Sequence, residues 1–201
     1  MENQPTQHME GEGLERRAEL GRRESPPRIY VASLGDYNAG RLHGEWIDAA
    51  QEPNDLHEAV VAMLKESPEP VAEEFAIHDY ENFGPLQLGE FESLDTVSRL
   101  ALGIASHGAA FAHYASLVGT DEDHLSNFEE AYFGHFDSLE SYANEALDDL
   151  GYVKQVDDLL PDYLEAYVTF DVESFARDLK ISGDVVTSEG DGGVYVFNGH
   201  V

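Results

Sequence analysis

The feature that most constrains this chain is an excess of acidic residues along the polar faces of amphipathic segments. The 201 residues include 41 acidic and 11 basic residues, which gives a formal net charge of -30. Residues 1–27 hold six of the acids and four arginines, so residues 28–201 carry a net charge of -28. Any fold of this sequence must bury enough apolar surface to offset the mutual repulsion of its carboxylates.

The segment 137–150 shows this conflict most clearly. Apolar residues recur there at helical spacing from Leu139 to Leu150. Ser138 suits the N-cap and Gly151 suits the position after the C-cap. Helices usually gain stability from Glu–Lys pairs four residues apart. This segment has no Lys or Arg to form such pairs, so the stability of the helix depends on burial of its apolar face. Its polar face has no Lys or Arg and consists of Glu140, Ser141, Asn144, Glu145, Asp148 and Asp149.

The N-terminal part is predicted to contain a tail and a small domain. Residues 1–27 are polar and offer little apolar surface, which is typical of a disordered tail. Residues 28–90 are predicted to form a β-β-α-β domain, with a turn at 35–40. The predicted elements are strands at 28–34 and 42–48, a helix that begins at Pro53 and ends before Pro68, and a strand at 73–80.

Residues 91–131 are predicted to form a helical middle domain. Apolar residues at helical spacing begin at Leu94, and Gly103 and Gly108 weaken or divide the helical run. No acid occurs between Asp95 and Asp121, so we expect this stretch to be mostly core. Thr120 is expected to cap the next helix, with Asp123 at its third position.

Residues 132–201 are predicted to form a C-terminal α/β domain. The fold class is therefore α+β, in three small domains. The predicted elements are an extended segment near 133–136, the helix at 138–150, a helix at 170–179 capped by Asp171 with a Glu173–Arg177 pair, and a hairpin that turns at 190–193.

Motifs for catalysis and cofactor binding are lacking in the sequence. No glycine-rich phosphate loop, nucleophile elbow or His-Glu-x-x-His motif occurs. Glu74 and His78 share a predicted strand face, but a lone pair rarely binds a metal, and Asp121–Asp123 lacks the spacing of a calcium loop. We therefore predict a protein that is not an enzyme, with no catalytic residue, no metal site and no cofactor.

The charge also limits the possible partners. Sparse basic residues disfavour direct binding to nucleic acid, and the chain has neither a membrane-spanning run nor a secretory signal. The absence of cysteine fits a reducing cytosol. The acidity itself has three explanations: solubility or adaptation to high salt, metal chelation, or a surface for a basic partner. Carboxylates three or four residues apart on a helix are about 5–6 Å apart at Cβ, a scale similar to that of DNA phosphates.

Five segments together resemble a known family. They are residues 29–47 (IYVASLGDYNAGRLHGEWI), 74–81 (EFAIHDYE), 130–143 (EAYFGHFDSLESYA), 175–179 (FARDL) and 193–197 (GVYVF). In this order they resemble the ArdA antirestriction proteins. The resemblance implies a DNA mimic from a mobile element or phage, cytoplasmic in a bacterial host. It also implies an inhibitor that occupies the DNA-binding groove of type I restriction–modification enzymes, at the methyltransferase core, and a curved, elongated homodimer with its contact in the C-terminal domain.

We therefore predict a partner-binding surface in which carboxylates stand in for phosphates. Two alternatives remain: an acidic binder of another basic DNA-binding protein, and an acid-rich enzyme of a salt-adapted organism. The predicted phosphate surrogates are Asp121, Glu122, Asp123, Glu129, Glu130, Glu140, Glu145, Asp148, Asp149, Asp157, Asp158, Asp162 and Glu165.

Overall fold

A computed structural model describes residues 25–70, 72–161, 163–164 and 167–201. Residues 1–24 of the predicted tail lie outside this range. The described residues form nine helices and two small antiparallel sheets, which confirms the mixed α and β composition. The chain divides into two compact units, one ending at Ser116 and one beginning at Leu117. The division into three domains near residues 90 and 131 stays a prediction.

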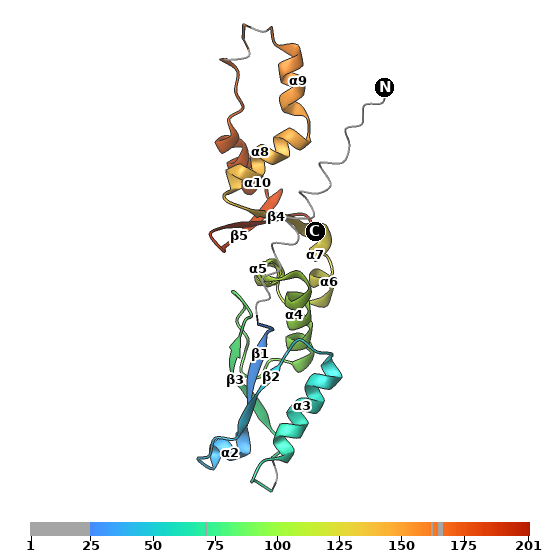
Figure 1. The fold of residues 1–201 in the computed structure, drawn as a ribbon, viewed down its shortest axis with the longest axis vertical. Helices are drawn as coiled ribbons and strands as arrows, with labels where there is room; N and C mark the ends of the chain where they lie inside the picture. Colours follow the sequence, from blue (N-terminus) through green and yellow to red (C-terminus); the bar gives the residue numbers. More distant parts are fainter. Residues whose placement is uncertain (1–24, 71, 162, 165–166) are drawn as a thin grey trace, which may run out of the picture. The chain divides into compact units, whose positions relative to one another are not determined.

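The first unit is built on a three-stranded sheet with β1 in the centre (Figure 1). β1 pairs antiparallel with both neighbours, and the β1–β3 register shifts between Tyr30 and Val31. α3 packs against β2 and α4, and its buried residues are Leu56, Val60 and Met63. The strands and α3 follow one another in the predicted order, with the short helix α2 added between β1 and β2. The elements are β1 (Arg28–Ser33), α2 (Leu34–Asn38), β2 (Gly44–Asp48), α3 (Pro53–Lys65), β3 (Phe75–Glu81), α4 (Leu94–His107) and α5 (Ala109–Val118).

A short helix, α2, replaces the turn predicted at 35–40. The Ser33 hydroxyl oxygen accepts a hydrogen bond from the Asp36 backbone N–H and caps this helix. The Asp36 side chain is fully buried, and it accepts hydrogen bonds from the Ser67 hydroxyl and from Arg41 Nε (3.3 Å). Arg41 also pairs with Glu69. These bonds, the one from Ser67 first, hold the pKa of Asp36 below its usual value, so Asp36 ties the 34–41 segment to residues 67–69.

The stretch without acids forms most of α4 and α5. The expected core is confirmed for α5, with six of its 10 residues buried, and only in part for α4, with six of 14. Gly108, with φ +68°, separates the two helices. Gly103 does not divide α4. A Cβ at Gly103 would lie 2.2 Å from Phe111 Cε1, so glycine there permits close packing of the Phe111 ring. The buried residues are Leu94, Val97, Ser98, Leu100, Ala101, Ile104 and Ala110 to Ala115.

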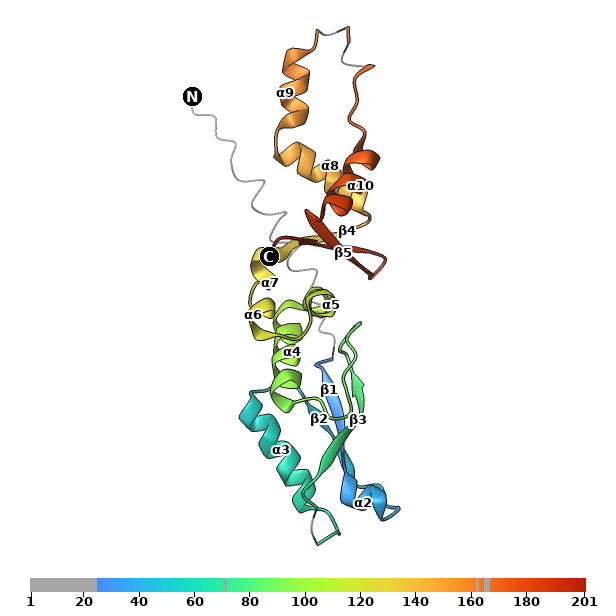
Figure 2. The same ribbon diagram turned by 180° about the vertical axis from the view of Figure 1, so that it is seen from behind.

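The second unit contains a sheet of order β4-β6-β5, with three helices between β4 and β5 in the chain (Figure 2). In both ribbon views α9 lies on the far side of α8 from this sheet (Figures 1 and 2). The final hairpin turns at Asp191 and Gly192, both with positive φ, as its sequence predicted. The elements are α6 (Glu122–Leu125), α7 (Phe128–Ala131), β4 (Tyr132–Phe136), α8 (Leu139–Asp149), α9 (Tyr152–Leu159), α10 (Val172–Ser182), β5 (Val185–Gly190) and β6 (Gly193–Asn198).

Two predicted caps are confirmed and one is wrong. The Ser138 hydroxyl accepts the Ser141 N–H (3.2 Å) at α8, and Asp171 accepts the Ser174 N–H (3.0 Å) at α10. α6, however, begins one residue later than expected. Its N-cap is Asp121, whose carboxylate accepts a hydrogen bond from the Asp123 backbone N–H (3.0 Å). This carboxylate takes the capping role that was predicted for the Thr120 hydroxyl.

The Glu173–Arg177 pair predicted in α10 does not form among the described side chains. Arg177 instead donates to the Ser174 hydroxyl (2.9 Å) and lies near Asp171. The Ser174 hydroxyl, one helical turn before Arg177, thus binds the guanidinium in place of the Glu173 carboxylate. The Asp171 carboxylate accepts from the backbone N–H and hydroxyl of Ser174, and together with the nearby Arg177 charge this lowers its pKa.

α8 and α9 differ in how well their apolar residues are covered. α8 buries Ala143 and Leu147 and packs against α10, β4 and β6. α9 has no fully buried residue. The acidic helix predicted at 138–150 is therefore held by a narrow apolar stripe. Among the described residues no helix has both the length and the apolar character needed to cross a membrane.

We expect Leu147→Ala to lower the free energy of unfolding of the second unit by about 2–5 kcal/mol, because it leaves a cavity under α8. Leu147 is 6% exposed, whereas Leu150 in the same turn is 56% exposed. Leu150→Ala should therefore change stability by only about 0.5 kcal/mol. Urea unfolding followed by circular dichroism measures both; equal losses would show that the stripe does not hold the helix.

We expect Ser138→Ala to raise the pKa of Glu140. Hydrogen bonds from the backbone N–H of Glu140 and from Ser138 hold this pKa below its usual value of 4.5. Because the pKa of Glu140 is lower in the folded chain than in the unfolded chain, its ionised carboxylate stabilises the fold above pH 4.5. This stabilisation is lost as the pH falls through the pKa of the folded state. Carboxyl ¹³C titration by NMR measures the change. Ser106→Ala, on exposed α4 surface, is the control, and an unchanged Glu140 pKa in Ser138→Ala would contradict the assignment.

Candidate partner-binding surface

Eleven of the thirteen predicted phosphate surrogates are described, and the side chains of all eleven are exposed. Asp162 and Glu165 lie outside the described residues. This exposure extends to the rest of the chain: apart from Asp36, Glu69 and Glu92, every described acid of residues 28–201 is exposed. The fold thus places its apolar residues inside and leaves a nearly complete carboxylate surface outside.

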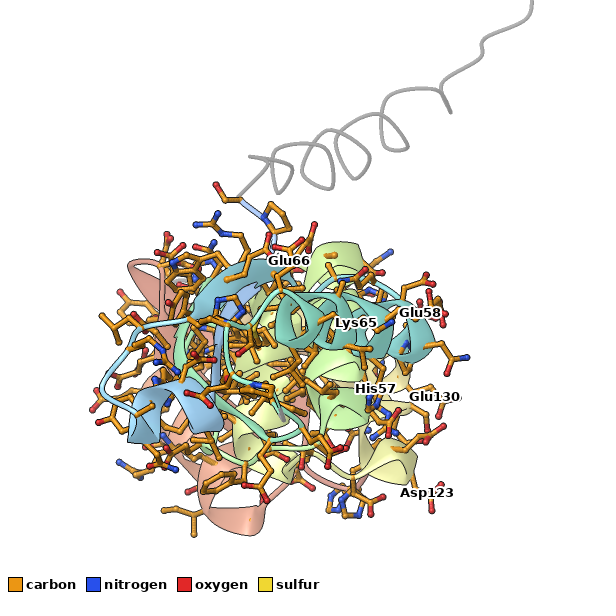
Figure 3. The ribbon with its side chains drawn as sticks, turned by 90° about the horizontal axis from the view of Figure 1, so that it is seen from below. His57, Glu58, Lys65, Glu66, Asp123 and Glu130 are labelled. Atoms are coloured by element: carbon orange, nitrogen blue, oxygen red, sulfur yellow. The ribbon has the colours of Figure 1, made fainter. Side chains whose placement is uncertain are left out.

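One group of candidates lies at the start of α6 and of α7. We call Asp121, Glu122, Asp123, Glu129 and Glu130 the α6–α7 cluster. In Figure 3 the Asp123 and Glu130 side chains project outward from these helices. Leu125 and Phe128 are buried beneath them. All five carboxylates occupy caps or first turns, where the helix dipole favours negative charge. The helix dipoles therefore offset part of the repulsion among these carboxylates.

A second group lies on α8 and α9. We call Glu140, Glu145, Asp148, Asp149, Asp157 and Asp158 the α8–α9 cluster. Glu145 and Asp149 are four residues apart on one helix, a spacing of about 5–6 Å at Cβ. Asp148 and Asp149 end α8, where the dipole disfavours anions. Lys154 is the basic residue of these two helices. The repulsion predicted for this segment is therefore present in the folded chain.

Further exposed acids in the first unit were not among the predicted surrogates. Glu58 and Glu66 project from the α3 end of the unit (Figure 3), accompanied by His57 and Lys65. The helical spacing that predicted α3 could also have marked Glu58 as solvent-facing. The acids Asp48, Asp79 and Glu81 are exposed on the sheet of this unit. Acidic surface is thus present in both units.

Metal binding finds no support among the described residues, where no group of three or more His, Cys, Asp or Glu side chains is placed to hold an ion. The contacts of His78 are with residues other than Glu74. Glu74 precedes β3, and His78 Nε2 lies 4.0 Å from Glu90 Oε1. The His78 ring packs edge-on against Tyr37, with ring centroids 5.2 Å apart. His78 therefore has local packing partners within its own unit.

The family assignment comes from comparison with protein-family models. The model for the antirestriction protein family ArdA matches residues 29–193. A search of curated proteins gives no match. The matched range runs from the start of β1 to the start of β6 and includes both acidic clusters. ArdA is a family of inhibitors, not one of known enzymes. With most of its length matched, this chain belongs to the ArdA family of antirestriction proteins.

Proposed function

We propose that this protein inhibits a type I restriction–modification enzyme by occupying the groove in which its methyltransferase core binds DNA. Antirestriction is the function of the family. The observation that carries the proposal is the exposure of every described carboxylate in the α6–α7 and α8–α9 clusters. Helices hold these carboxylates in rows, so they present fixed negative charge to a groove lined with basic residues.

The attraction would resemble that of DNA for the same groove. Duplex DNA carries one negative charge per about 1.7 Å of axis, and its phosphates dominate its affinity for proteins. The net charge of -28 on residues 28–201 equals that of roughly 14 base pairs at this density. Steering by such a field speeds association and weakens as salt rises. Many carboxylates share the contact, so no single one should be essential.

We further infer that the protein acts as a homodimer of chains with three small domains, in contact through the C-terminal domain. Exposed apolar side chains in the second unit support self-association. Their exposed fractions are large for apolar residues, at 84% for Leu159, 74% for Tyr163 and 83% for Tyr167. A second copy that covers them would bury apolar area and double the number of carboxylates presented to the enzyme.

Salt distinguishes the proposal from a salt-adapted enzyme. A protein adapted to high salt needs molar salt to fold, whereas a DNA mimic folds at low salt and loses partner affinity as ionic strength rises. Thermal unfolding and partner binding across a salt series measure these two properties separately. An acidic binder of another basic DNA-binding protein would fold at low salt but leave the restriction enzyme on its DNA.

We expect simultaneous reversal to Lys of the six α8–α9 acids to abolish inhibition, while any single reversal has little effect. The assay is displacement of DNA from a type I methyltransferase core at low ionic strength. Reversal of six exposed acids of the first unit that lie outside β1, β2 and β3 gives a comparison with the same net charge.

Two results would contradict the proposal. Wild-type protein that does not displace DNA would exclude this partner. One Ala substitution that destroys inhibition in a folded protein would exclude mimicry shared among many carboxylates. Circular dichroism establishes that each variant is folded.

A further inference from the structure

The sheet of the first unit carries aromatic, basic and acidic side chains together on one face. The register places them in two cross-strand rows. Asp48, Arg28 and Glu81 form one row, and Trp46, Tyr30 and Asp79 form the next. We call these six residues the Trp46 face. The alternate residues Ile29 and Ile47 are buried in the core. Trp46 and Tyr30 are half-buried, and Asp48, Asp79 and Glu81 are exposed.

The first row shows what kind of group this face binds. Arg28 Nη2 lies 2.7 Å from Glu81 Oε2, and the Arg28 guanidinium carbon lies 5.2 Å from the centroid of the Trp46 ring. A carboxylate and an aromatic ring thus hold one guanidinium between them. Ring faces attract cations, and carboxylates bind guanidinium groups strongly. Glu81 of the first row and Trp46 of the second row thus already bind an arginine of the chain itself.

The second row repeats two of these three components. The Tyr30 and Trp46 ring centroids are 5.6 Å apart, and Asp79 stands opposite Tyr30 on β3. Asp79 Oδ1 accepts the backbone N–H of Tyr80 (2.8 Å), which orients the carboxylate while the residue stays exposed. The position that Arg28 fills in the first row is filled by Tyr30 in the second. Because Arg28 already contacts the Trp46 ring, the second row adds the Tyr30 ring and the exposed Asp79 carboxylate as groups for a guanidinium that a partner would supply.

Gly44 fixes the position of the Tyr30 ring. A Cβ at Gly44 would lie 2.9 Å from the Tyr30 hydroxyl oxygen and 2.5 Å from the Val31 carbonyl oxygen. A side chain at residue 44 would meet both the β1 backbone and the Tyr30 hydroxyl, so glycine leaves room for the ring beside β2. The pair of half-buried rings is set by the backbone of β2, as expected of a preformed contact surface.

We propose that the Trp46 face is a contact surface for a basic protein and that its second row binds an arginine side chain of that protein. Half-buried aromatic residues with a charged rim match the make-up of protein interfaces. The exposed Asp48, Asp79 and Glu81 and the net charge of -28 on residues 28–201 favour a basic partner. Only the identity of that partner, the restriction enzyme, rests on the function proposed above.

The first experiment uses the single tryptophan of the chain as a local probe. Full-length protein labelled with 5-fluorotryptophan is titrated with hexa-arginine and with hexa-lysine, and the ¹⁹F resonance of Trp46 reports binding at this face. We expect hexa-arginine to shift the resonance at lower concentration than hexa-lysine. Asp79→Asn keeps the Oδ1 acceptor but loses the charge, and should weaken the arginine effect by about 5- to 10-fold.

Glu58→Gln on α3 is the matched control, because it removes one exposed charge from the same unit. It should change the apparent affinity at Trp46 by less than about twofold. Equal weakening by Asp79→Asn and Glu58→Gln would overturn the proposal, since it would show diffuse attraction alone. Equal responses to hexa-arginine and hexa-lysine would overturn it as well.

The second experiment measures the affinity of the full chain for the methyltransferase core. Trp46→Leu should weaken binding about tenfold, and Trp46→Phe should retain most of it. Phe91→Leu is the control, because Phe91 is 73% exposed in the same unit. Full affinity in folded Trp46→Leu would overturn the assignment of the face to this enzyme. If the wild-type protein does not bind the core, the proposed function fails, and the peptide titration still decides whether the face binds arginine.

Discussion

The rest of this structure depends on one constraint: burial of narrow apolar stripes must offset the repulsion among the carboxylates. α8 carries four of the candidate acids yet buries only Ala143 and Leu147 completely. α4 and α5 each bury six residues and lie where the sequence has no acid after Asp95. Charge and core are thus separated along the chain as well as across each helix. A small domain has little net stability to lose, so this separation limits how much charge it can carry.

Much of the fold follows from local patterns, and the departures have physical reasons. Helical spacing predicted α3, α8 and α10, and turn residues predicted the final hairpin. The segment at 35–40 begins as a helix capped by Ser33, and local patterns did not predict that Asp36 would be buried against Ser67, 31 residues away in the sequence. Helical spacing also predicted that the candidate acids would be exposed, because it places them on the faces opposite the apolar residues. The Trp46 face was not, because its rows depend on a strand register that joins Arg28 to Glu81.

In the proposed complex, the two units would offer different kinds of contact to a basic partner. The α8–α9 cluster presents exposed charge, which chiefly accelerates encounter and is weakened by salt. The Trp46 face presents half-buried rings beside carboxylates. Contacts of that second kind exclude water and chiefly slow dissociation. An inhibitor with both kinds can approach a groove as DNA does and remain there longer than its charge alone allows.

Asp36 has a consequence for any attempt to neutralise the acidic surface. It is a carboxylate of this acid-rich chain that faces inward, bonded to Ser67 and Arg41 and fully buried. Strong acid neutralises the surface carboxylates and then also protonates Asp36, whose pKa is lowered, so the first unit loosens after the proposed phosphate surrogates have lost their charge. Mobile ions screen exposed carboxylates but act far less on a buried one. Added salt therefore separates the electrostatics of the surface from the integrity of the fold, and acid does not.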